Sequence, residues 1–210
     1  MLEDELREKG KTIAEVIARL DMKDEEVVNR VESPEYQSIL KKAFRNWSAI
    51  DSESKREKIR NLLANAAATN LTSDDVIKLF IDWLELYSDF HFEVIGEIYR
   101  NTGITRGRIW QNLTKPRVSE DSAEADLYKL LVRDLSTGGV IRQHREKDYY
   151  GNFVKKQTKP APKGQGAKTM VSAFDNNEGY ELTELGKQFV HYAMQDISLK
   201  IAFQAENVEA

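Results

Sequence analysis

The sequence has 210 residues, a net charge of −4 at neutral pH, 40% hydrophobic and 31% charged residues, and no cysteine. This composition is typical of soluble globular proteins with one compact domain or two small ones, and the lack of cysteine excludes disulfides, thiolate zinc sites and cysteine nucleophiles. No apolar run has the length of a membrane span, and the N-terminus MLEDELREKGK lacks the apolar core of a secretory signal, so we expect a cytoplasmic protein that does not enter a membrane.

The first ninety residues are predicted to form a bundle of helices. Apolar residues recur there at helical spacing, and no alternation of apolar and polar residues indicates a strand. Capping residues precede three of these helices. They are Ser33 before a proline, Asp51 or Ser52 before the next helix, and Ser73 before two acids. We therefore expect residues 1–87 to be an acidic helical domain.

Three further helices are predicted from residue 88 on. Their approximate ranges are 88–100, 106–113 and 119–137. The third helix has apolar residues three and four positions apart, which are expected to line its buried side, and these are Leu127, Leu130, Leu131 and Leu135. A glycine pair at 138–139 then ends the helix.

Strands and a closing helix follow. VIRQH reads as a strand, and TMVSAF and GYELT are two further strand candidates separated by the turn signal DNNEG. Thr183 is placed to cap a last helix that contains Leu185, Phe189 and Tyr192. The long polar segment between the first strand and the other two has no periodicity that indicates a regular element.

Basic residues are concentrated in the middle of the chain. Residues 100–170 contain 15 Lys and Arg against 7 Asp and Glu, whereas residues 1–99 contain 14 against 21 and residues 171–210 contain 2 against 7. Such a concentration is typical of a surface that binds a polyanion. The alternative interpretation is a polar loop that is rich in lysine without a binding role.

The order of these elements carries a resemblance. LYKLLVRDLSTGGVIRQH resembles the end of the third helix and the first wing strand of winged-helix domains, and YELTELGKQFV resembles the second wing strand and the closing helix. The resemblance covers the chain from Ser88 to about Met194, but the hairpin between His144 and Tyr180 is longer than the family's usual wing. A helical domain ahead of such a module also resembles several uncharacterised bacterial proteins.

The resemblance implies a mainly α fold, with an N-terminal helical bundle followed by a winged-helix domain that holds a small antiparallel β-hairpin or sheet. The winged-helix-like domain would span 88–210 and would carry an extended basic wing loop at 145–170. Its third helix would read a DNA groove and its wing would touch phosphate or the minor groove. The expected nucleic-acid-binding residues are Arg106, Arg108, Lys129, Arg133, Arg142, Arg145, Lys147, Lys155 and Lys156.

Motifs for catalysis are incomplete in this sequence. KGQGAKT has neither of the two glycines that a phosphate-binding loop needs in its pattern and is not followed by a helix. The three histidines are far apart and lack metal-ligand spacing, and no serine lies in a GxSxG context. We expect no enzyme activity, no cofactor and no metal.

Two functional hypotheses follow. The first is a winged-helix nucleic-acid-binding protein, such as a bacterial or phage transcriptional regulator or a DNA-associated accessory factor, with double-stranded DNA as its partner. The second is a non-enzymatic adaptor that uses the winged helix to hold another protein, because fold alone does not determine what such a face binds. In either case the N-terminal helices are a candidate surface for a protein partner or a homodimer.

Overall fold

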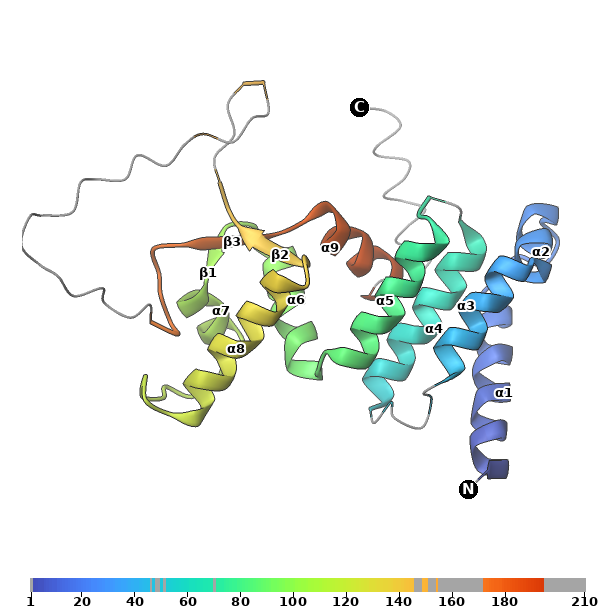
Figure 1. The fold of residues 1–210 in the computed structure, drawn as a ribbon, viewed down its shortest axis with the longest axis horizontal. Helices are drawn as coiled ribbons and strands as arrows, with labels where there is room; N and C mark the ends of the chain where they lie inside the picture. Colours follow the sequence, from blue (N-terminus) through green and yellow to red (C-terminus); the bar gives the residue numbers. More distant parts are fainter. Residues whose placement is uncertain are drawn as a thin grey trace, which may run out of the picture. The chain divides into compact units, whose positions relative to one another are not determined.

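The structure is a computed structural model and describes most of the chain, namely residues 2–45, 47, 50, 52–69, 71–145, 149–150, 154 and 172–194. These residues are mainly helical and include a small three-stranded antiparallel sheet (Figure 1). They divide into two compact units: the described residues of 2–92 together with 187–194, and the described residues of 93–186. No helix in the described residues is both long and apolar enough to cross a membrane.

The first unit is a helical bundle built around α4. Its helices are α1 (Leu2–Ala18), α2 (Glu25–Glu32), α3 (Pro34–Arg45), α4 (Glu53–Ala68), α5 (Asp74–Leu86), the start of α6 (Asp89–Arg100), and the end of α9 (Glu184–Phe189) with the π-helix η2 (Val190–Met194). The helices α1, α2, α3, α5 and η2 all pack on α4. Because α4 has neighbours on every side, its residues from Ile59 to Ala67 are all buried.

Polar side chains of α4 hold η2 in place. The Asn61 amide donates to the carbonyl of Ala193 at 3.3 Å, and the Asn65 amide donates to the carbonyl of Tyr192 at 3.0 Å. The hydroxyls of Thr69 and Tyr192 lie 3.0 Å apart. The two amide bonds give backbone partners to polar side chains that α4 buries.

Helix caps follow the sequence prediction at two of three serines. The hydroxyl of Ser33 accepts from the Tyr36 amide at 3.2 Å, and the hydroxyl of Ser52 accepts from the Lys55 amide at 3.1 Å. Ser73 occupies the N-cap position of α5, but its side chain makes no capping hydrogen bond.

The second unit joins helices to a sheet. It contains the remainder of α6, β1 (Ile104–Thr105), α7 (Arg106–Asn112), α8 (Ala123–Thr137), β2 (Ile141–Gln143) and β3 (Gly179–Leu182). β3 is the central strand and pairs antiparallel with both β1 and β2. The strands β2 and β3 confirm the prediction, β1 was missed, and the described end of the TMVSAF candidate, 172–174, lies outside any strand.

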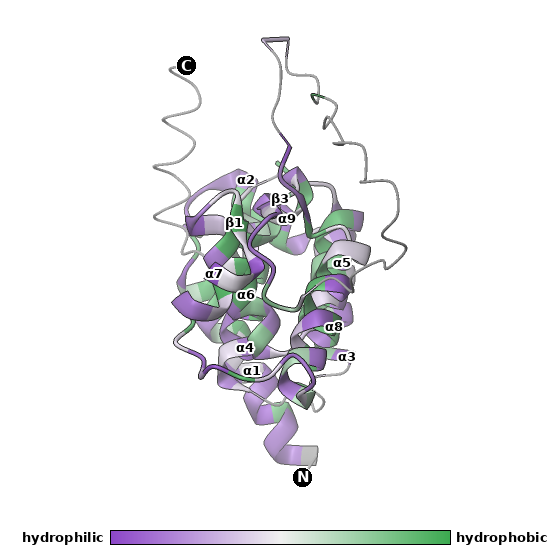
Figure 2. Cartoon of the chain, turned by 90° about the vertical axis from the view of Figure 1, so that its left-hand side faces the viewer, coloured by the Kyte–Doolittle hydropathy of each residue, from purple (hydrophilic) through white to green (hydrophobic). Residues whose placement is uncertain are grey.

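The buried side of α8 differs from the prediction. Its buried apolar residues are Ala125, Tyr128, Leu131, Val132 and Leu135, whereas Leu127 is 53% exposed and Leu130 is 41% exposed. The buried stripe of α8 is rotated about the helix axis from the predicted one, so that it keeps Leu131 and Leu135 and leaves Leu127 and Leu130 at its edge. The hydroxyl of Tyr128 also donates to the carbonyl of Arg106 at 2.9 Å, which turns the Tyr128 side of the helix inward. Figure 2 shows this mixture of hydrophobic and hydrophilic residues along the helices.

Gly179 is required where β3 meets the end of α6. A Cβ on residue 179 would overlap the carbonyl oxygen of Gly103, the residue whose amide donates to the Tyr180 carbonyl at 2.8 Å. We expect Gly179→Ala to lower the free energy of unfolding in urea by about 1–3 kcal/mol, because backbone atoms must move apart. Gly10→Ala is the control: nothing lies within 4 Å of the added carbon, so stability is expected to stay the same or rise. Equal effects of the two changes would contradict this account.

Candidate nucleic-acid interface

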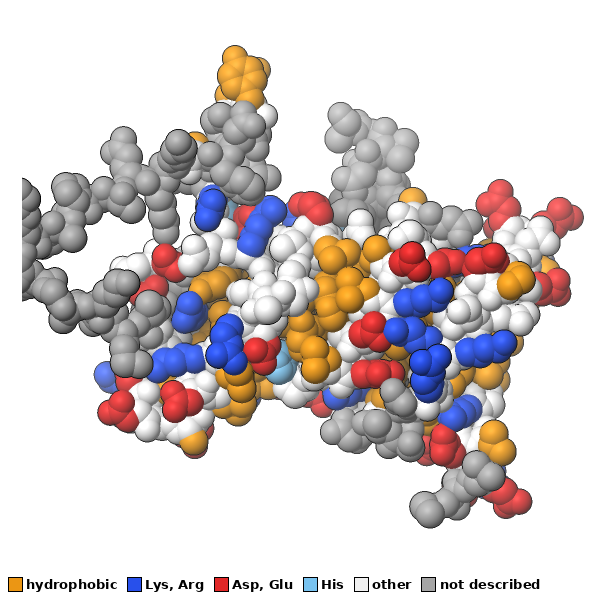
Figure 3. Space-filling model, in the orientation of Figure 1, with side chains coloured by type: hydrophobic (Ala, Val, Ile, Leu, Met, Phe, Trp, Pro, Cys, Tyr) orange, Lys and Arg blue, Asp and Glu red, His pale blue; other side chains and the backbone are white. Residues whose placement is uncertain are grey.

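Four of the predicted basic residues line one hollow of the second unit. Arg106 comes from α7, Lys129 and Arg133 from α8, and Arg142 from β2, around a hollow of about 430 Å³. The other lining residues are Val132, Ser136, Ile141, Gln143 and Tyr180. Figure 3 shows blue Lys and Arg side chains around the α8 and β2 region of this unit, with acidic side chains beside them.

The two cations of α8 are one helical turn apart and face the same side. The Lys129 amine lies 3.7 Å from a Glu120 carboxylate oxygen and 3.8 Å from Asp126. The Arg133 side chain is 71% exposed, and in the described part of the chain its ion-pair partner, Asp134, lies 3.7 Å away. Ion pairs this long and this exposed contribute little to stability, so both side chains can exchange their partners for an anion at small cost.

Arg106 is held in place by groups that carry no charge. Its guanidinium donates to the hydroxyl of Tyr180 at 2.8 Å and 2.5 Å and lies over the ring of Tyr180, 5.3 Å from the centroid. Its backbone carbonyl is bound by the buried Tyr128, and burial raises the pKa of that phenol. Arg106 is therefore positioned while its positive charge is left without a carboxylate partner among the described residues.

Arg142 differs, because a buried carboxylate compensates its charge. Glu181 is 8% exposed, and its two oxygens lie 2.7 Å from Arg142 Nε and 2.7 Å from His144 Nδ1. Burial alone would raise the pKa of Glu181, but the bonds from Arg142 and His144 outweigh it and hold the pKa below its ordinary value. Arg142 thus contributes less net charge to the hollow than the other three cations.

The remaining predicted residues do not line this hollow. Arg108 is exposed on α7, and Arg145 is exposed just after β2. Lys147, Lys155 and Lys156 lie outside the described residues.

Tyr180 and Glu181 are the residues of this site that the sequence prediction missed. The strand register places Arg142 directly opposite Glu181, so opposite charges form a cross-strand pair. The sequence GYEL indicates a strand that contains both residues. Its register against IRQ could not be predicted, because more than thirty residues separate the two strands.

Within the described residues, no group of three or more His, Asp or Glu side chains is arranged to hold a metal ion. Comparisons with protein-family models, with curated proteins and with solved structures found no match to this chain.

The lowered pKa of Glu181 predicts a pH dependence of stability. A carboxylate with a depressed pKa in the folded state stabilises the protein above its ordinary pKa of 4.5, and that stabilisation is lost as the pH falls below 4.5 through the folded-state value. We expect Glu181→Gln to lower the free energy of unfolding at pH 7 by about 1–3 kcal/mol and to reduce its fall between pH 5 and pH 3.

Urea unfolding measured at a series of pH values checks this prediction. Glu124→Gln is the matched control, since it removes an exposed carboxylate of α8 and is expected to change little at either pH. A Glu181→Gln protein with the stability and acid sensitivity of the control would contradict the assigned role of Glu181.

Proposed function

We propose that the second unit is a winged helix that binds duplex DNA, and that the protein acts as a transcriptional regulator or a DNA-associated accessory factor. α8 would lie in the major groove, and the strands β2 and β3 would approach the flanking backbone. The hollow lined by Arg106, Lys129, Arg133 and Arg142 is the observation that carries the proposal.

The order of elements supports this assignment. Three helices, α6, α7 and α8, precede two antiparallel strands that are joined by a long segment, which is the order that the resemblance in the sequence implies. The short β1 between α6 and α7 pairs with β3 and ties the start of α7 to the sheet. The second unit therefore has a helix available at its surface beside a strand pair.

The charges of the hollow also support binding to a phosphate backbone. Phosphate contacts by Lys and Arg supply most of the affinity of non-specific DNA binding, and guanidinium groups bind phosphate through two parallel hydrogen bonds. The charges of Arg106 and Arg133 are only weakly compensated by carboxylates among the described residues, and the two side chains line the same hollow from neighbouring helices. A row of phosphates along one strand would meet both.

Residues of α7 and α8 would contact different parts of the DNA. Arg133 is exposed enough to reach a guanine edge, and Asp126 is placed to accept from a cytosine amine. Arg106 is fixed by Tyr180 and would bind the backbone. Backbone contacts set the register of a protein on DNA, while base contacts provide the specificity.

We expect the double variant Lys129→Gln and Arg133→Gln to bind duplex DNA at least tenfold more weakly at low salt. The slope of log affinity against log salt concentration should fall by about 2, because each lost phosphate contact removes about 0.9. Fluorescence anisotropy of a labelled duplex, titrated at several salt concentrations, measures both quantities.

The matched control is Lys23→Gln with Lys41→Gln, which removes the same charge from exposed positions of the first unit. It should leave the affinity and the salt slope close to those of the wild type. If the unmodified protein shows no binding at low salt, or if both double variants weaken it equally, the hollow is not a DNA-binding surface.

An adaptor role is the second candidate, and the exposure of α8 leucines favours it. Leu127 and Leu130 are exposed apolar side chains on the same helix. A protein partner that covers them would co-purify after nuclease treatment and would be lost with Leu127→Asp. Elution of the nuclease-treated protein as a lone monomer, with no partner retained, would count against this role.

A further inference from the structure

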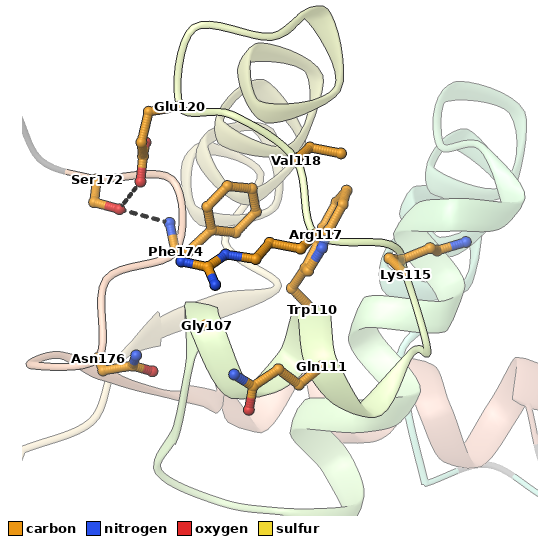
Figure 4. A pocket seen from close by; sticks show the side chains of 10 residues that line it. All are labelled: Gly107, Trp110, Gln111, Lys115, Arg117, Val118, Glu120, Ser172, Phe174 and Asn176. Atoms are coloured by element: carbon orange, nitrogen blue, oxygen red, sulfur yellow. Dashed lines mark hydrogen bonds between the residues drawn. The ribbon is translucent and has the colours of Figure 1, made fainter.

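A second hollow in the second unit has the size and walls of a small-molecule site. Its volume is about 590 Å³, and it lies between α7, the connection that leads to α8, and the segment that precedes β3 (Figure 4). The lining residues are Gly107, Trp110, Gln111, Lys115, Arg117, Val118, Glu120, Ser172, Phe174 and Asn176. Ligand pockets commonly have volumes of about 300–1,000 Å³ and mostly apolar walls with a few polar groups.

Aromatic rings form the wall of this hollow. The rings of Trp110 and Phe174 have centroids 5.1 Å apart at 60°, and both pack on Tyr128 from the core side. The Trp110 indole donates to the carbonyl of Pro116 at 3.0 Å, so its ring has a fixed orientation. Val118 adds an aliphatic side chain to the lining. Such walls favour a flat apolar ring.

Close backbone contacts and hydrogen bonds link the two sides of the hollow. A Cβ at Gly107 would lie 2.7 Å from the Phe174 carbonyl oxygen, so only glycine lets the segment before β3 sit this close to α7. The Gly107 amide donates to the Asp175 carbonyl at 3.2 Å, and the Thr105 hydroxyl donates to Asn176 at 2.7 Å. These contacts join α7 to the described part of the segment before β3.

Arg117 supplies the positive charge. Figure 4 shows its side chain extended between Trp110 and Phe174, while Lys115 points away, with its amine 3.2 Å from a carboxylate oxygen of Glu93. The Arg117 guanidinium makes no hydrogen bond or ion pair with any residue in the described part of the chain. Its donors are therefore free to bind an anion.

The one carboxylate in the lining is already occupied. Glu120 accepts from the Ser172 hydroxyl and from the Ala173 amide at 2.9 Å, and Lys129 lies 3.7 Å away. The bond from Ser172 is the largest of the influences that lower the pKa of Glu120, followed by the Ala173 amide. Since these donors compensate its charge, Glu120 opposes an anion in the hollow less than a bare carboxylate would.

We propose that this hollow binds a small organic anion with a flat ring, in which the ring takes the space beside Trp110 and Phe174 into which the Arg117 side chain now extends, and the exposed Arg117 side chain turns to bind the anionic group. The amides of Gln111 and Asn176, at the rim, add hydrogen-bonding groups for polar substituents of the ring. The proposal does not depend on DNA binding, because none of its binding groups is a cation of the α8 hollow.

Isothermal titration calorimetry with naphthoate tests the proposal on the full-length protein. Naphthylmethanol is the matched neutral probe, with the same ring and no charge. We expect naphthoate to bind at least tenfold more tightly than naphthylmethanol, and Arg117→Gln to remove that difference while leaving naphthylmethanol unchanged, because a charge-assisted hydrogen bond to the anion is lost.

Two further variants make the result decisive. Lys41→Gln removes one positive charge from an exposed position of the first unit and should leave naphthoate binding as in the wild type. Val118→Asp places a negative charge in the lining and should abolish naphthoate binding, with the unfolding midpoint in urea as a check that each variant is folded. Equal affinity for the two probes, or an Arg117→Gln protein that binds naphthoate like the wild type, would overturn the proposal.

Discussion

Pairing of β3 with both β1 and β2 determines where the side chains of the cationic hollow in the second unit lie. The Tyr180 carbonyl accepts from the Gly103 amide on one side, and the Gly179 carbonyl accepts from the His144 amide on the other. β1 leads directly into α7, and β2 follows α8 after a turn of three residues. A single strand of four residues thus fixes both helices, and with them Arg106 and Lys129, against one sheet.

Two side chains of β3 also contact the arginines of the cationic hollow directly. Tyr180 turns its hydroxyl to Arg106, and Glu181, its neighbour in sequence, faces Arg142 and His144. Successive strand residues point to opposite sides. The neutral hydroxyl of Tyr180 therefore positions Arg106, while the carboxylate of Glu181 compensates the charge of Arg142. The effective positive charge of the hollow is therefore set by β3 as much as by the basic residues themselves.

Local patterns in the sequence were sufficient to predict the helices and part of the candidate site. Ser33 and Ser52 cap where predicted, and the spacing of four between Lys129 and Arg133 places both on one face of α8. The exposure of Leu127 was not predictable, because it depends on which arc of α8 meets the sheet. The hollow around Arg117 was missed for a similar reason: Trp110 and Phe174 are more than sixty residues apart, and only the packing of the returning segment on Gly107 brings them together.

Glu120 connects the two hollows of the second unit. Its carboxylate lines the aromatic hollow and accepts from Ser172 and Ala173, and the same group lies 3.7 Å from Lys129, which lines the cationic one. If Lys129 bound a phosphate, as in the proposed DNA complex, Glu120 would keep the two donors of the 172–173 segment and lose only a long, exposed ion pair, which contributes little. The aromatic hollow therefore keeps its frame whether or not Lys129 is engaged.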